Sequence, residues 1–522
     1  APVAVYRSPY PPLDIPAVPL TDFVLARAAE RGGRAALVDS VSGRTITYGE
    51  LPGLVDRAAA ALARLGLRKG DVCAIFSSNT PDYAIAVLAI ARLGAIVTTA
   101  SPMYTRADLA KQIGDCRTRF LLTSNALRET VRGLAVERLF SFDVMEGATP
   151  FGDLLAEPGT PPAVSIDPSD VVALPYSSGT TGLPKGVMLS HRNLIANILQ
   201  VDRSGHLRDG EDTLVCFLPF FHIYGLTVVM MLGLRSGATL VVMPRFELEP
   251  YFDLVERHRA TMLHVVPPIV LAFAKSPAVS GRDFSSVRKL FSGAAPLGAD
   301  VIGQCTARLG CFLQQGYGLT ESSPATHTTP DSAAATKDGS IGVPVANTEC
   351  RVVDPATRQD VAPGQDGEIW IRGPQVMLGY YNRPEETRAT VDADGWLHTG
   401  DIGHADADGH FFIVDRLKEL IKYKGMQIAP AELESVLLSH PAVADAAVVP
   451  EKSDEAGEIP HAFVVLKAPA TADELMAFVA QHVASFKKIR RLTFVDVIPK
   501  SPSGKILRRI LRESLVASAP AT

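Results

Sequence analysis

Residues 176–193 of the 522-residue chain read YSSGTTGLPKGVMLSHRN. The first half of this stretch consists mostly of Ser, Thr and Gly, which are poor formers of both helix and strand. Backbone N–H groups of a Gly-rich turn converge on anions, hydroxyls add donors, and Lys185 adds a positive charge. The preceding residues, VVALPYS, are typical of a strand, and the following ones, HRNLIANILQ, of a helix. We therefore predict a phosphate-binding loop between a strand and a helix.

This loop differs from a Walker A motif, in which a lysine directly follows the second glycine. Here Lys185 lies three residues after Gly182, and the stretch taken alone is explained equally well as a flexible surface loop. Four later stretches favour a nucleotide site: QGYGLTES at 315–322, GWLHTGD at 395–401, VDRLKELIKYKG at 414–425 and SPSGK at 501–505. Each could be a helix cap, a turn or a solvated face when taken singly. Together they combine lysines with acidic residues suited to ribose hydroxyls or Mg²⁺.

Composition and charge exclude several classes of protein. The net charge is −5 and no basic domain is present, which argues against a nucleic-acid partner. The apolar runs are too short for a membrane-spanning helix, and the proline-rich residues 1–20 predict an extended arm rather than a signal peptide. The six cysteines form no CxxC pair, which is typical of reduced thiols in a cytoplasmic protein. The sequence leaves open whether the protein is a monomer or a dimer.

Strand-like and helix-like segments alternate along residues 36–124 and 213–275, which predicts parallel α/β sheets. Beyond residue 340, turn residues recur between short β runs, which predicts a small, largely antiparallel β region. A helix, two strands and a helix follow. We therefore predict an α/β protein whose large N-terminal domain, residues 1–417, contains two parallel-type α/β subdomains and the β region. A small mobile α+β C-terminal domain spans residues 418–522.

Three local patterns give sharper predictions. Amphipathic spacing predicts a helix over residues 21–35. Thr47 and Glu50 have the spacing of a capping box, which predicts a helix from this point to about Leu65. The segment GLTVVMMLGLRSG predicts a helix over residues 225–237.

The motifs quoted above resemble those of the adenylate-forming superfamily, which contains acyl-CoA synthetases, peptide-synthetase adenylation domains and luciferases. They occur in that family's order and spacing, from about residue 20 to 512. The stretches most similar to 4-coumarate–CoA ligases are LPFFHIYGL at 218–226, VPPIVLAFAKSP at 266–277, SGAAPLG at 292–298 and KGMQIAPAELE at 424–434. The resemblance implies two steps. A carboxylate attacks the α-phosphate of ATP to give acyl-AMP and pyrophosphate, and coenzyme A then displaces AMP to give a thioester.

The resemblance also implies roles for residues around the nucleotide. Donors and Lys185 beside the departing pyrophosphate would stabilise its developing charge. Glu321 would bind Mg²⁺, Asp401 would bind the ribose hydroxyls, and Arg416 would help to hold the nucleotide. The residues expected to line the phosphate, adenine and α-phosphate sides are Ser177, Ser178, Gly179, Thr180, Thr181, Lys185, Gln315, Gly316, Tyr317 and Thr320, the last also as a catalytic candidate.

Lys505 resembles the lysine that bridges the carboxylate and the α-phosphate during adenylation in this family. A cation at that position offsets the repulsion between two anions. Lys418 resembles the family's hinge residue. Rotation about it would withdraw Lys505, which suits a residue needed in only one half-reaction.

The same rotation would present a second face of the C-terminal domain. The residues predicted for that face are Lys422, Lys424, Gly425 and Gln427. In similar enzymes the first contacts the acyl-adenylate, the last serves thioester formation, and the other two approach coenzyme A. Arg245 lies where relatives carry a basic residue that meets the coenzyme A nucleotide.

The acyl site departs from the family pattern. His222, which on its own would be explained as a packed core residue, resembles the histidine that guards and orients the acyl carboxylate. Plant 4-coumarate ligases commonly read HIYALNS where this chain reads HIYGLTV. Tyr224 would form one wall of the acyl pocket, and Val228 would be the last residue of that wall. Phe291 replaces a basic or small residue. These changes remove a partner for a phenolic hydroxyl and favour a more apolar acid. The predicted substrate-contacting residues are Tyr224, Val228, Phe291, Gly293 and Ala294.

We predict an AMP-forming CoA ligase that acts on an aryl-propenoic acid such as 4-coumarate or cinnamate, with ATP, Mg²⁺ and coenzyme A. A medium-chain fatty acyl-CoA ligase would have the same nucleotide residues and differ only in the acyl pocket. A carrier-protein-loading adenylation enzyme would carry an acidic residue for an amino group near the start of the HIY helix, which this chain lacks. A luciferase-like oxygenase is disfavoured because the residues on the coenzyme A side are intact.

Overall fold

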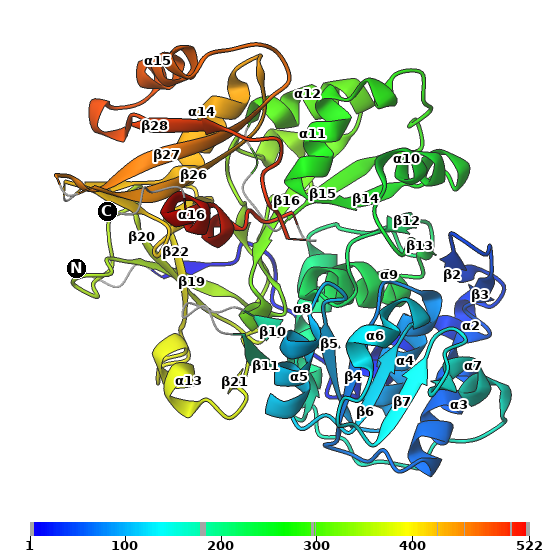
Figure 1. Ribbon diagram of the computed structural model, residues 1–522. Coiled ribbons are helices and arrows are strands. Elements are labelled where there is room, and N and C mark those ends of the chain that lie inside the picture. The colour runs from blue at the N-terminus through cyan, green and yellow to red at the C-terminus, as the bar shows by residue number, and fades with distance from the viewer. Residues whose placement is uncertain are drawn as a thin grey trace.

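The computed structural model describes residues 5–177, 184–293, 297, 299–424, 426–453, 455–501 and 504–517. Among these residues the strands form five sheets, with blue and cyan segments at the lower right of Figure 1, green segments above them and the orange to red C-terminal part at the upper left. The predicted fold class, a large N-terminal α/β part followed by a small C-terminal part, is confirmed.

The largest sheet has parallel strands at its centre and antiparallel strands at one end. Its order is β10-β11-β9-β5-β4-β6-β7-β8, and β21 pairs with β11. The strands are β4 (Val72–Phe76), β5 (Ile96–Ala100), β6 (Phe120–Thr123), β7 (Arg138–Ser141), β8 (Thr149–Pro150), β9 (Val171–Ala173), β10 (Tyr176–Ser177), β11 (Lys185–Ser190) and β21 (Gly379–Tyr380). Every residue of β4 is buried, because helices cover a central parallel strand on both faces.

Side-chain caps start several of the helices that flank this sheet. Thr80 accepts a hydrogen bond from the backbone N–H of Tyr83, and Ser190 forms a capping box with Asn193. The helices of this part are α3 (Leu51–Arg64), α4 (Pro81–Arg92), α5 (Arg106–Asp115), α6 (Arg128–Val131), α7 (Phe151–Ala156) and α8 (His191–Arg203), with the 3₁₀ turn η1 (Asn125–Leu127). These caps fix where the chain leaves each strand.

Two further sheets contain most of the green strands of Figure 1, together with the dark blue β2 and β3. One contains β12 (Thr213–Cys216), β13 (Thr239–Val242), β2 (Ala35–Asp39) and β3 (Thr45–Thr47). The other contains β14 (Met262–Val265), β15 (Lys289–Ser292), β16 (Phe312–Gly318), β17 (Ala325–Thr328) and β18 (Val343–Pro344). The helical segments are α1 (Leu20–Leu25), α2 (Ala28–Arg31), η2 (Tyr224–Met231), α9 (Leu232–Arg235), α10 (Leu248–Arg257), α11 (Pro267–Lys275), η3 (Pro277–Val279), α12 (Ala299–Leu309), η4 (Thr320–Ser322) and η5 (Ala333–Ala335).

The predicted β region beyond residue 340 is an antiparallel sheet. Its order is β1 (Tyr6–Arg7), β19 (Glu349–Val353), β20 (Gly367–Arg372), β22 (Leu397–Ala405) and β23 (Phe411–Arg416). The helix α13 (Pro384–Thr390) follows β21. Strand β1 shows that residues 6–7 of the predicted arm pair with β19.

The C-terminal part has a sheet of its own. Its order is β25 (Met426–Ile428), β24 (Ile421–Tyr423), β27 (Gly457–Leu466) and β26 (Val443–Ser453), with β28 (Arg491–Phe494) paired to β27. Its helical segments are α14 (Pro430–Ser439), α15 (Ala472–His482), η6 (Ser485–Lys487) and α16 (Arg508–Ala517). The predicted order of helix, strand, strand and helix is confirmed by α14, β26, β27 and α15.

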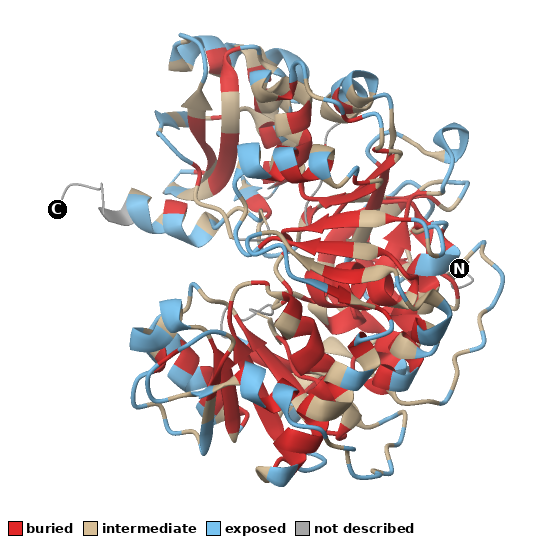
Figure 2. Cartoon of the chain, turned by 90° about the vertical axis from the view of Figure 1, so that its right-hand side faces the viewer, coloured by how far each residue is buried: buried red, intermediate tan, exposed pale blue. Residues whose placement is uncertain are grey.

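Buried side chains follow the strands and the inner faces of the helices, and exposed residues lie on the outer helices and loops (Figure 2). One apolar cluster extends from Leu20 to Tyr380 through the N-terminal sheets. A separate cluster, from Ile421 to Ile489, belongs wholly to the C-terminal part. No helix in the described part of the chain is long and apolar enough to cross a membrane.

The structure corrects three local predictions. The predicted helix over 21–35 is two short helices, α1 and α2, because Arg31 and Arg34 turn to donate hydrogen bonds to carbonyls near α9. The Thr47–Glu50 hydrogen bonds exist, but they close the turn before α3, which begins at Leu51. The predicted α-helix over 225–237 is the π-helix η2 followed by the short α9.

Candidate active site

The predicted phosphate-binding loop lies between two antiparallel strands, β10 and β11. Ser177 ends β10 and lies opposite Lys185, the first residue of β11. The predicted residues Ser178, Gly179, Thr180 and Thr181 lie outside the described residues. The predicted order of strand, loop and helix is wrong, because β11 intervenes and the N-terminus of α8 is already capped by Ser190. A phosphate at this loop would therefore meet the hairpin and not a helix end.

Glu321 connects β10 of this hairpin with β21, the strand that pairs with β11. The Ser177 hydroxyl and the Tyr380 hydroxyl both donate to its Oε1, at 2.7 Å and 2.8 Å. The ammonium group of Lys185 lies 4.8 Å from the centre of the Tyr380 ring, a distance at which the cation is attracted to the ring face. Glu321 and Lys185 are 7% and 5% exposed, so both charged side chains lie in a partly dehydrated setting.

Asp401 lies in a second cluster, at the junction with the C-terminal part. The Tyr317 hydroxyl donates to its Oδ2 at 2.5 Å, and Arg416, its partner across β22 and β23, reaches Oδ1 at 3.2 Å. Burial and the Asp401 charge raise the pKa of Tyr317 well above its ordinary value, so this phenol stays protonated and donates. The carboxylate of Asp401 is thereby held as a fixed acceptor.

The C-terminal lysine predicted from SPSGK lies beside this cluster. Burial first, and then the charge of Arg416, lower the pKa of Lys505 to about 8, with Asp401 acting in the opposite direction. The same lysine contributes to lowering the pKa of His222, so the two groups interact electrostatically. Lys505 is itself exposed to solvent, so an anion could still reach it. A site with this positive character attracts anionic ligands.

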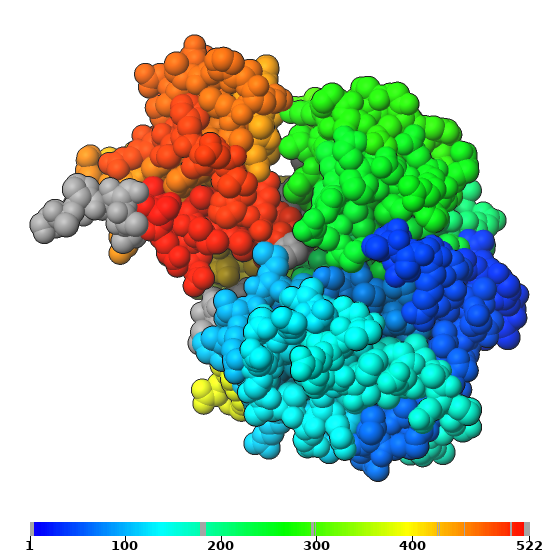
Figure 3. Space-filling view, turned by 45° about the vertical axis from the view of Figure 1, so that its right-hand side comes forward, coloured from blue at the N-terminus to red at the C-terminus, as the bar shows by residue number. Residues whose placement is uncertain are grey.

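Gly504 explains how the Lys505 loop approaches the N-terminal part so closely. A Cβ at this position would lie 3.2 Å from the Val266 side chain and 3.3 Å from Pro268, and its φ is +79°. Both conditions favour glycine. Figure 3 shows the orange to red C-terminal part lying against the green part that carries these residues.

His222 and Tyr224 stand at the start of the π-helix η2. Dehydration, the larger cause, and Lys505 lower the pKa of His222 to about 4, so its imidazole is neutral near pH 7. Its Nδ1 accepts the backbone N–H of Tyr224 at 3.3 Å. Val228 follows Tyr224 by about one π-turn, is 2% exposed and therefore shares its face of the helix.

Tyr224 and Phe291 form one continuous surface, which we call the Tyr224–Phe291 wall. The Tyr224 hydroxyl donates to the Phe291 carbonyl at 3.0 Å. A Cβ at Gly293 would lie 3.3 Å from the Tyr224 ring, and one at Gly316 would clash with the Phe291 ring at 2.4 Å. These two positions therefore require glycine. The predicted residue Ala294 lies outside the described residues.

Two predicted nucleotide residues make other contacts. The backbone N–H of Gln315 donates to Thr329 at 2.8 Å, and its side-chain amide donates to the Ser340 carbonyl at 3.2 Å. Thr320 begins the 3₁₀ turn η4, which also carries Glu321. The turn therefore sets the direction of the Glu321 carboxylate.

The residues predicted for coenzyme A that the structure describes have other partners. Lys422 and Lys424 belong to the hairpin of β24 and β25, where the Lys422 backbone N–H donates to Glu458 at 2.8 Å and the Lys424 ammonium pairs with Glu455 at 3.5 Å. Gly425 and the side chain of Gln427 lie outside the described residues. Arg245 is exposed and forms an ion pair with Glu247.

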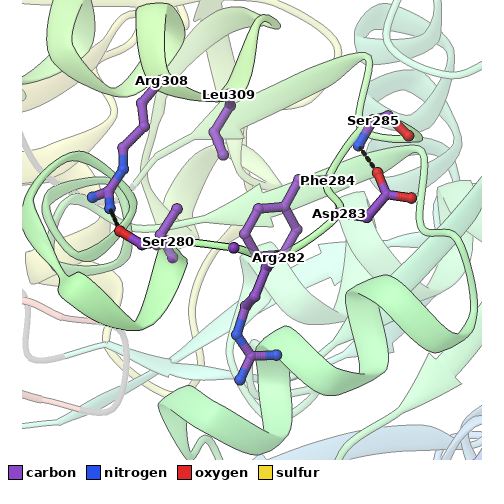
Figure 4. A pocket seen from close by; sticks show the side chains of 9 residues that line it. Ser280, Arg282, Asp283, Phe284, Ser285, Arg308 and Leu309 are labelled. Carbon is purple, nitrogen blue, oxygen red and sulfur yellow. Dashed lines mark hydrogen bonds between the residues drawn. The ribbon is translucent and has the colours of Figure 1, made fainter.

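A surface cavity of about 470 Å³ lies elsewhere, beneath the loop between α11 and α12 (Figure 4). Arg308 donates to Ser280 at 2.9 Å, and Arg282 donates to Asp253 and Glu256 at 2.7 Å and 2.8 Å. The two arginines that line this cavity therefore already have protein partners. None of the predicted site residues lines the cavity.

We did not predict Tyr380 as a site residue. We also did not predict the contact between Tyr317 and Asp401. Tyr380 belongs to the segment LGYYNRP at 378–384, where no charge or glycine pattern marks a site. Its role follows from β21 pairing with β11, which brings residues almost 200 positions apart into contact.

Sequence and structure comparisons agree with this arrangement. A model of the family described as AMP-binding enzyme matches residues 24–381, and one described as AMP-binding enzyme C-terminal domain matches residues 432–505. Relatives include 4-coumarate–CoA ligase 5 of Oryza sativa subsp. japonica, 47% identical over 99% of this chain and 98% of that protein. Another is 4-coumarate–CoA ligase 2 of Petroselinum crispum, 43% identical over 98% of this chain and 97% of that protein.

Two similar solved structures contain nucleotide ligands. An anthranilate CoA ligase in complex with anthranoyl-AMP superposes with a TM-score of 0.88 at 26% identity, covering 97% of this chain and 99% of that one. ATP-bound MatB from Rhodopseudomonas palustris gives 0.87 at 28% identity, covering 96% and 99%. The chain therefore belongs to the adenylate-forming, AMP-binding enzyme family, in the branch that contains the 4-coumarate–CoA ligases.

Proposed function

We propose that this AMP-forming acid–thiol ligase acts on an aryl-propenoic acid such as 4-coumarate or cinnamate. A carboxylate oxygen attacks the α-phosphorus of ATP, and the bond from that phosphorus to pyrophosphate breaks. The coenzyme A thiolate then attacks the acyl carbon, and the carbon–oxygen bond to AMP breaks. The products are the acyl-CoA thioester, AMP and pyrophosphate. The acid class rests on the names of full-length relatives at 43–47% identity.

The mechanism is supported by the packing of the Lys505 loop, at Gly504, against Val266 and Pro268, together with the electrostatic effects of Lys505 on His222 and of Asp401 on Lys505. The acid and the α-phosphate would meet between these groups, and the ammonium would reduce their mutual repulsion. Neutral His222 would leave the acid as a carboxylate and orient it by a hydrogen bond. We assign Lys505 as the catalytic residue of adenylation on this basis.

The cluster around Glu321 and Lys185 and the cluster around Asp401 would hold opposite ends of the nucleotide. Ser177, Lys185 and the loop residues Ser178, Gly179, Thr180 and Thr181 would bind the β- and γ-phosphates. Asp401, fixed by Tyr317 and Arg416, would accept the ribose hydroxyls. Gln315, Gly316 and Thr320 would border the adenine and the α-phosphate.

The site also fits Mg²⁺. This cation keeps several waters and needs one or two carboxylates together with substrate phosphates. Both hydrogen bonds to Glu321 reach Oε1, and within the described residues none reaches Oε2. Glu321 would hold the metal, which when bound would neutralise charge on the departing pyrophosphate.

We assign a domain boundary at the hinge, with residues 1–417 and 418–522 on its two sides. Separate apolar clusters and a separate family match support it. Rotation at Lys418 would remove Lys505 and bring the β24–β25 hairpin to the site. Lys422 and Gln427 would then serve thioester formation. Lys424, Gly425 and Arg245 would bind coenzyme A.

The Tyr224–Phe291 wall would contact the acyl group. Val228, Gly293 and Ala294 complete the proposed acyl site, in which the glycine leaves room beside the Tyr224 ring. We also infer that the protein works in the cytoplasm. All six cysteines are unpaired thiols, five of them buried, as expected in a reducing compartment.

Pyrophosphate release tests the function. The enzyme would receive ATP and Mg²⁺ with 4-coumarate, cinnamate, benzoate, octanoate or an amino acid, with and without coenzyme A. We expect turnover with the two aryl-propenoic acids and a thioester product by mass spectrometry. Preference for octanoate would instead identify a fatty acyl-CoA ligase, and turnover with none of these acids would overturn the proposed acid class.

A further inference from the structure

Two buried histidines contact the Tyr224–Phe291 wall through their rings, and the proposed mechanism gives them no role. His206 follows α8, and His264 lies on β14. Their Nε2 atoms are 2.7 Å apart, and the residues are 0% and 2% exposed. Neither belongs to any motif recognised in the sequence. We call them the His206–His264 pair.

The pair is neutral at physiological pH. Burial, followed by the charges of His264, Lys289 and Arg288, keeps the pKa of His206 well below its ordinary value. Burial likewise lowers the pKa of His264 to about 3, although Asp212 acts in the opposite direction. Both pKa values lie below the physiological range, so the pair is not a pH switch there.

A hydrogen bond between two neutral imidazoles through their Nε2 atoms also fixes whether each Nδ1 carries a proton. One Nε2 carries the shared proton, so the Nδ1 of that ring is a bare acceptor. The other ring accepts at Nε2, so its proton sits on Nδ1. Neither Nδ1 has a hydrogen-bond partner among the described residues. The pair therefore offers one unused donor and one unused acceptor in a buried setting.

Aromatic contacts connect the pair to the acyl site. The His206 and Phe291 rings meet edge to face, with centroids 4.4 Å apart. The His264 ring lies 6.1 Å from that of Tyr224 and 6.2 Å from that of Phe291. His264 is opposite Phe291 in the sheet register, and the neighbouring Ser292 hydroxyl also lacks a partner in the described chain. Unused polar groups thus gather at one end of the wall.

Buried polar groups without partners destabilise a fold and are rare in native proteins. Apolar side chains of similar size would avoid this penalty. A ligand that supplies the missing partners explains why polar rings stand here. A hydroxyl group suits both sites, because it donates to a bare Nδ1 and accepts from a protonated one.

We propose that the His206–His264 pair is the polar end of the acyl site and binds a hydroxyl at the far end of the substrate's aromatic ring. This inference rests on the proposed function. It assigns the chain a preference for a phenolic acid such as 4-coumarate over cinnamate. Val228 and Phe291 alone favoured a more apolar acid, because no local sequence pattern reveals that these histidines contact Phe291.

The test is the ratio of kcat/KM for 4-coumarate to that for cinnamate. We expect His264→Leu to lower this ratio at least about tenfold, because one hydrogen bond to the hydroxyl is lost. His264→Gln, which keeps a donor and an acceptor, should restore part of it. His327→Leu is the matched control: His327 is 0% exposed, but Thr326 and Cys350 already partner its ring nitrogens. That variant should leave the ratio within about twofold of the parent.

A second measurement uses the unaltered protein and so does not depend on folding of a variant. Histidine side-chain ¹⁵N signals would be recorded with non-hydrolysable adenylate analogues of the two acids. The 4-coumaroyl analogue should shift an Nδ1 signal of the pair, and the cinnamoyl analogue should not. An unchanged ratio in His264→Leu, or equal shifts with both analogues, would overturn the inference while leaving the ligase activity in place. Failure of the parent enzyme with both acids would overturn the proposed function and this inference with it.

Discussion

At the scale of single residues, the site depends on groups whose charge is set by their neighbours. His222 is neutral because it is dehydrated and lies near Lys505. The pKa of Lys505 is lowered to about 8 by partial dehydration and by the charge of Arg416, although the residue as a whole is exposed to solvent. Tyr317 and Tyr380 remain phenols that donate to Asp401 and Glu321. Each carboxylate is thereby aimed before any ligand binds, which reduces reorganisation during the reaction.

Replacing Lys505 separates the two half-reactions. Lys505→Ala should slow acyl-AMP formation by about 10²–10³-fold, because it removes a positive charge from the transition state. The same variant should still convert pre-made acyl-AMP to thioester with coenzyme A. Rapid-quench assays of each half-reaction would measure this. Equal losses in both would contradict the two-face model.

The pH dependence of adenylation follows from the same lysine. Its pKa is lowered to about 8, so its charge is present below that pH and is lost as the pH rises through it. We expect kcat/KM for pyrophosphate release to fall above about pH 8. Lys505→Arg keeps its charge throughout and should lack this alkaline limb, whatever its absolute rate. An identical limb in both proteins would assign the titration to another group.

Tyr380→Phe tests the orientation of Glu321. The variant keeps the ring that faces Lys185 but removes the hydroxyl that donates to the carboxylate. A hydrogen bond to a charged group accounts for roughly a 10–100-fold loss in kcat/KM. The Mg²⁺ concentration needed for half-maximal rate should rise as well. A lower melting temperature with unchanged Mg²⁺ dependence would indicate a purely structural role.

At the scale of elements, periodicity located most of the secondary structure. The alternation predicted over residues 36–124 is present, for example as β4 (Val72–Phe76) followed by α4 (Pro81–Arg92) and β5 (Ile96–Ala100). Short-range signals were less reliable where tertiary contacts compete. The π-helix at Tyr224–Met231 contains an all-apolar run that predicts a helix but not its pitch. A Cβ at Gly225 would lie 2.1 Å from the carbonyl oxygen of Pro219, a constraint that no local pattern reveals.

Helix α14 provides a contact between the two sides of the proposed hinge. The backbone N–H of Ala431, in its first turn, donates to the Asp415 carboxylate at 3.0 Å. Asp415 is at the end of β23, before Lys418, and Ala431 lies after it. This bond belongs to the orientation in which Lys505 faces the site.

Asp415→Ala should therefore weaken that orientation. Loss of a helix N-terminal acceptor costs about 1 kcal/mol, so we expect roughly a fivefold slower adenylation. Thioester formation from pre-made acyl-AMP should not slow. Asp415→Asn keeps an acceptor oxygen and serves as the control. A matching decrease in both half-reactions would mean that Asp415 stabilises the fold rather than one orientation.

At the scale of the whole molecule, we propose that the C-terminal part moves as a separate domain. Its sheet has its own apolar cluster, and within the described residues a smaller apolar cluster at the junction contains Ile402, Leu420 and Ala429, with Val414 packed against them. A small interface permits relative movement of domains. The exposed Leu417 and Lys418 lie in the connecting segment.

Limited proteolysis with trypsin tests this division. Cleavage should occur first between Arg416 and Lys424, where several basic residues and exposed backbone coincide. The fragment from about residue 418 should retain its helical circular dichroism. Saturating acid and ATP should slow the cut, because they hold Lys505 at the site. Early cleavage inside either body would contradict the proposed boundary.

The sequence by itself determined the family, the alternation of strands and helices and the identity of the nucleotide-facing residues, because glycines, hydroxyls and charges at short spacing carry that chemistry locally. Only the tertiary structure decided which of these groups meet. It placed the Lys505 loop against Val266 and Pro268, brought the Tyr380 hydroxyl to Glu321 and placed a strand where a helix was expected after the loop. It also paired His206 with His264 in contact with Phe291. These contacts join residues tens to hundreds of positions apart, and they arise from sheet register and packing rather than from any local pattern.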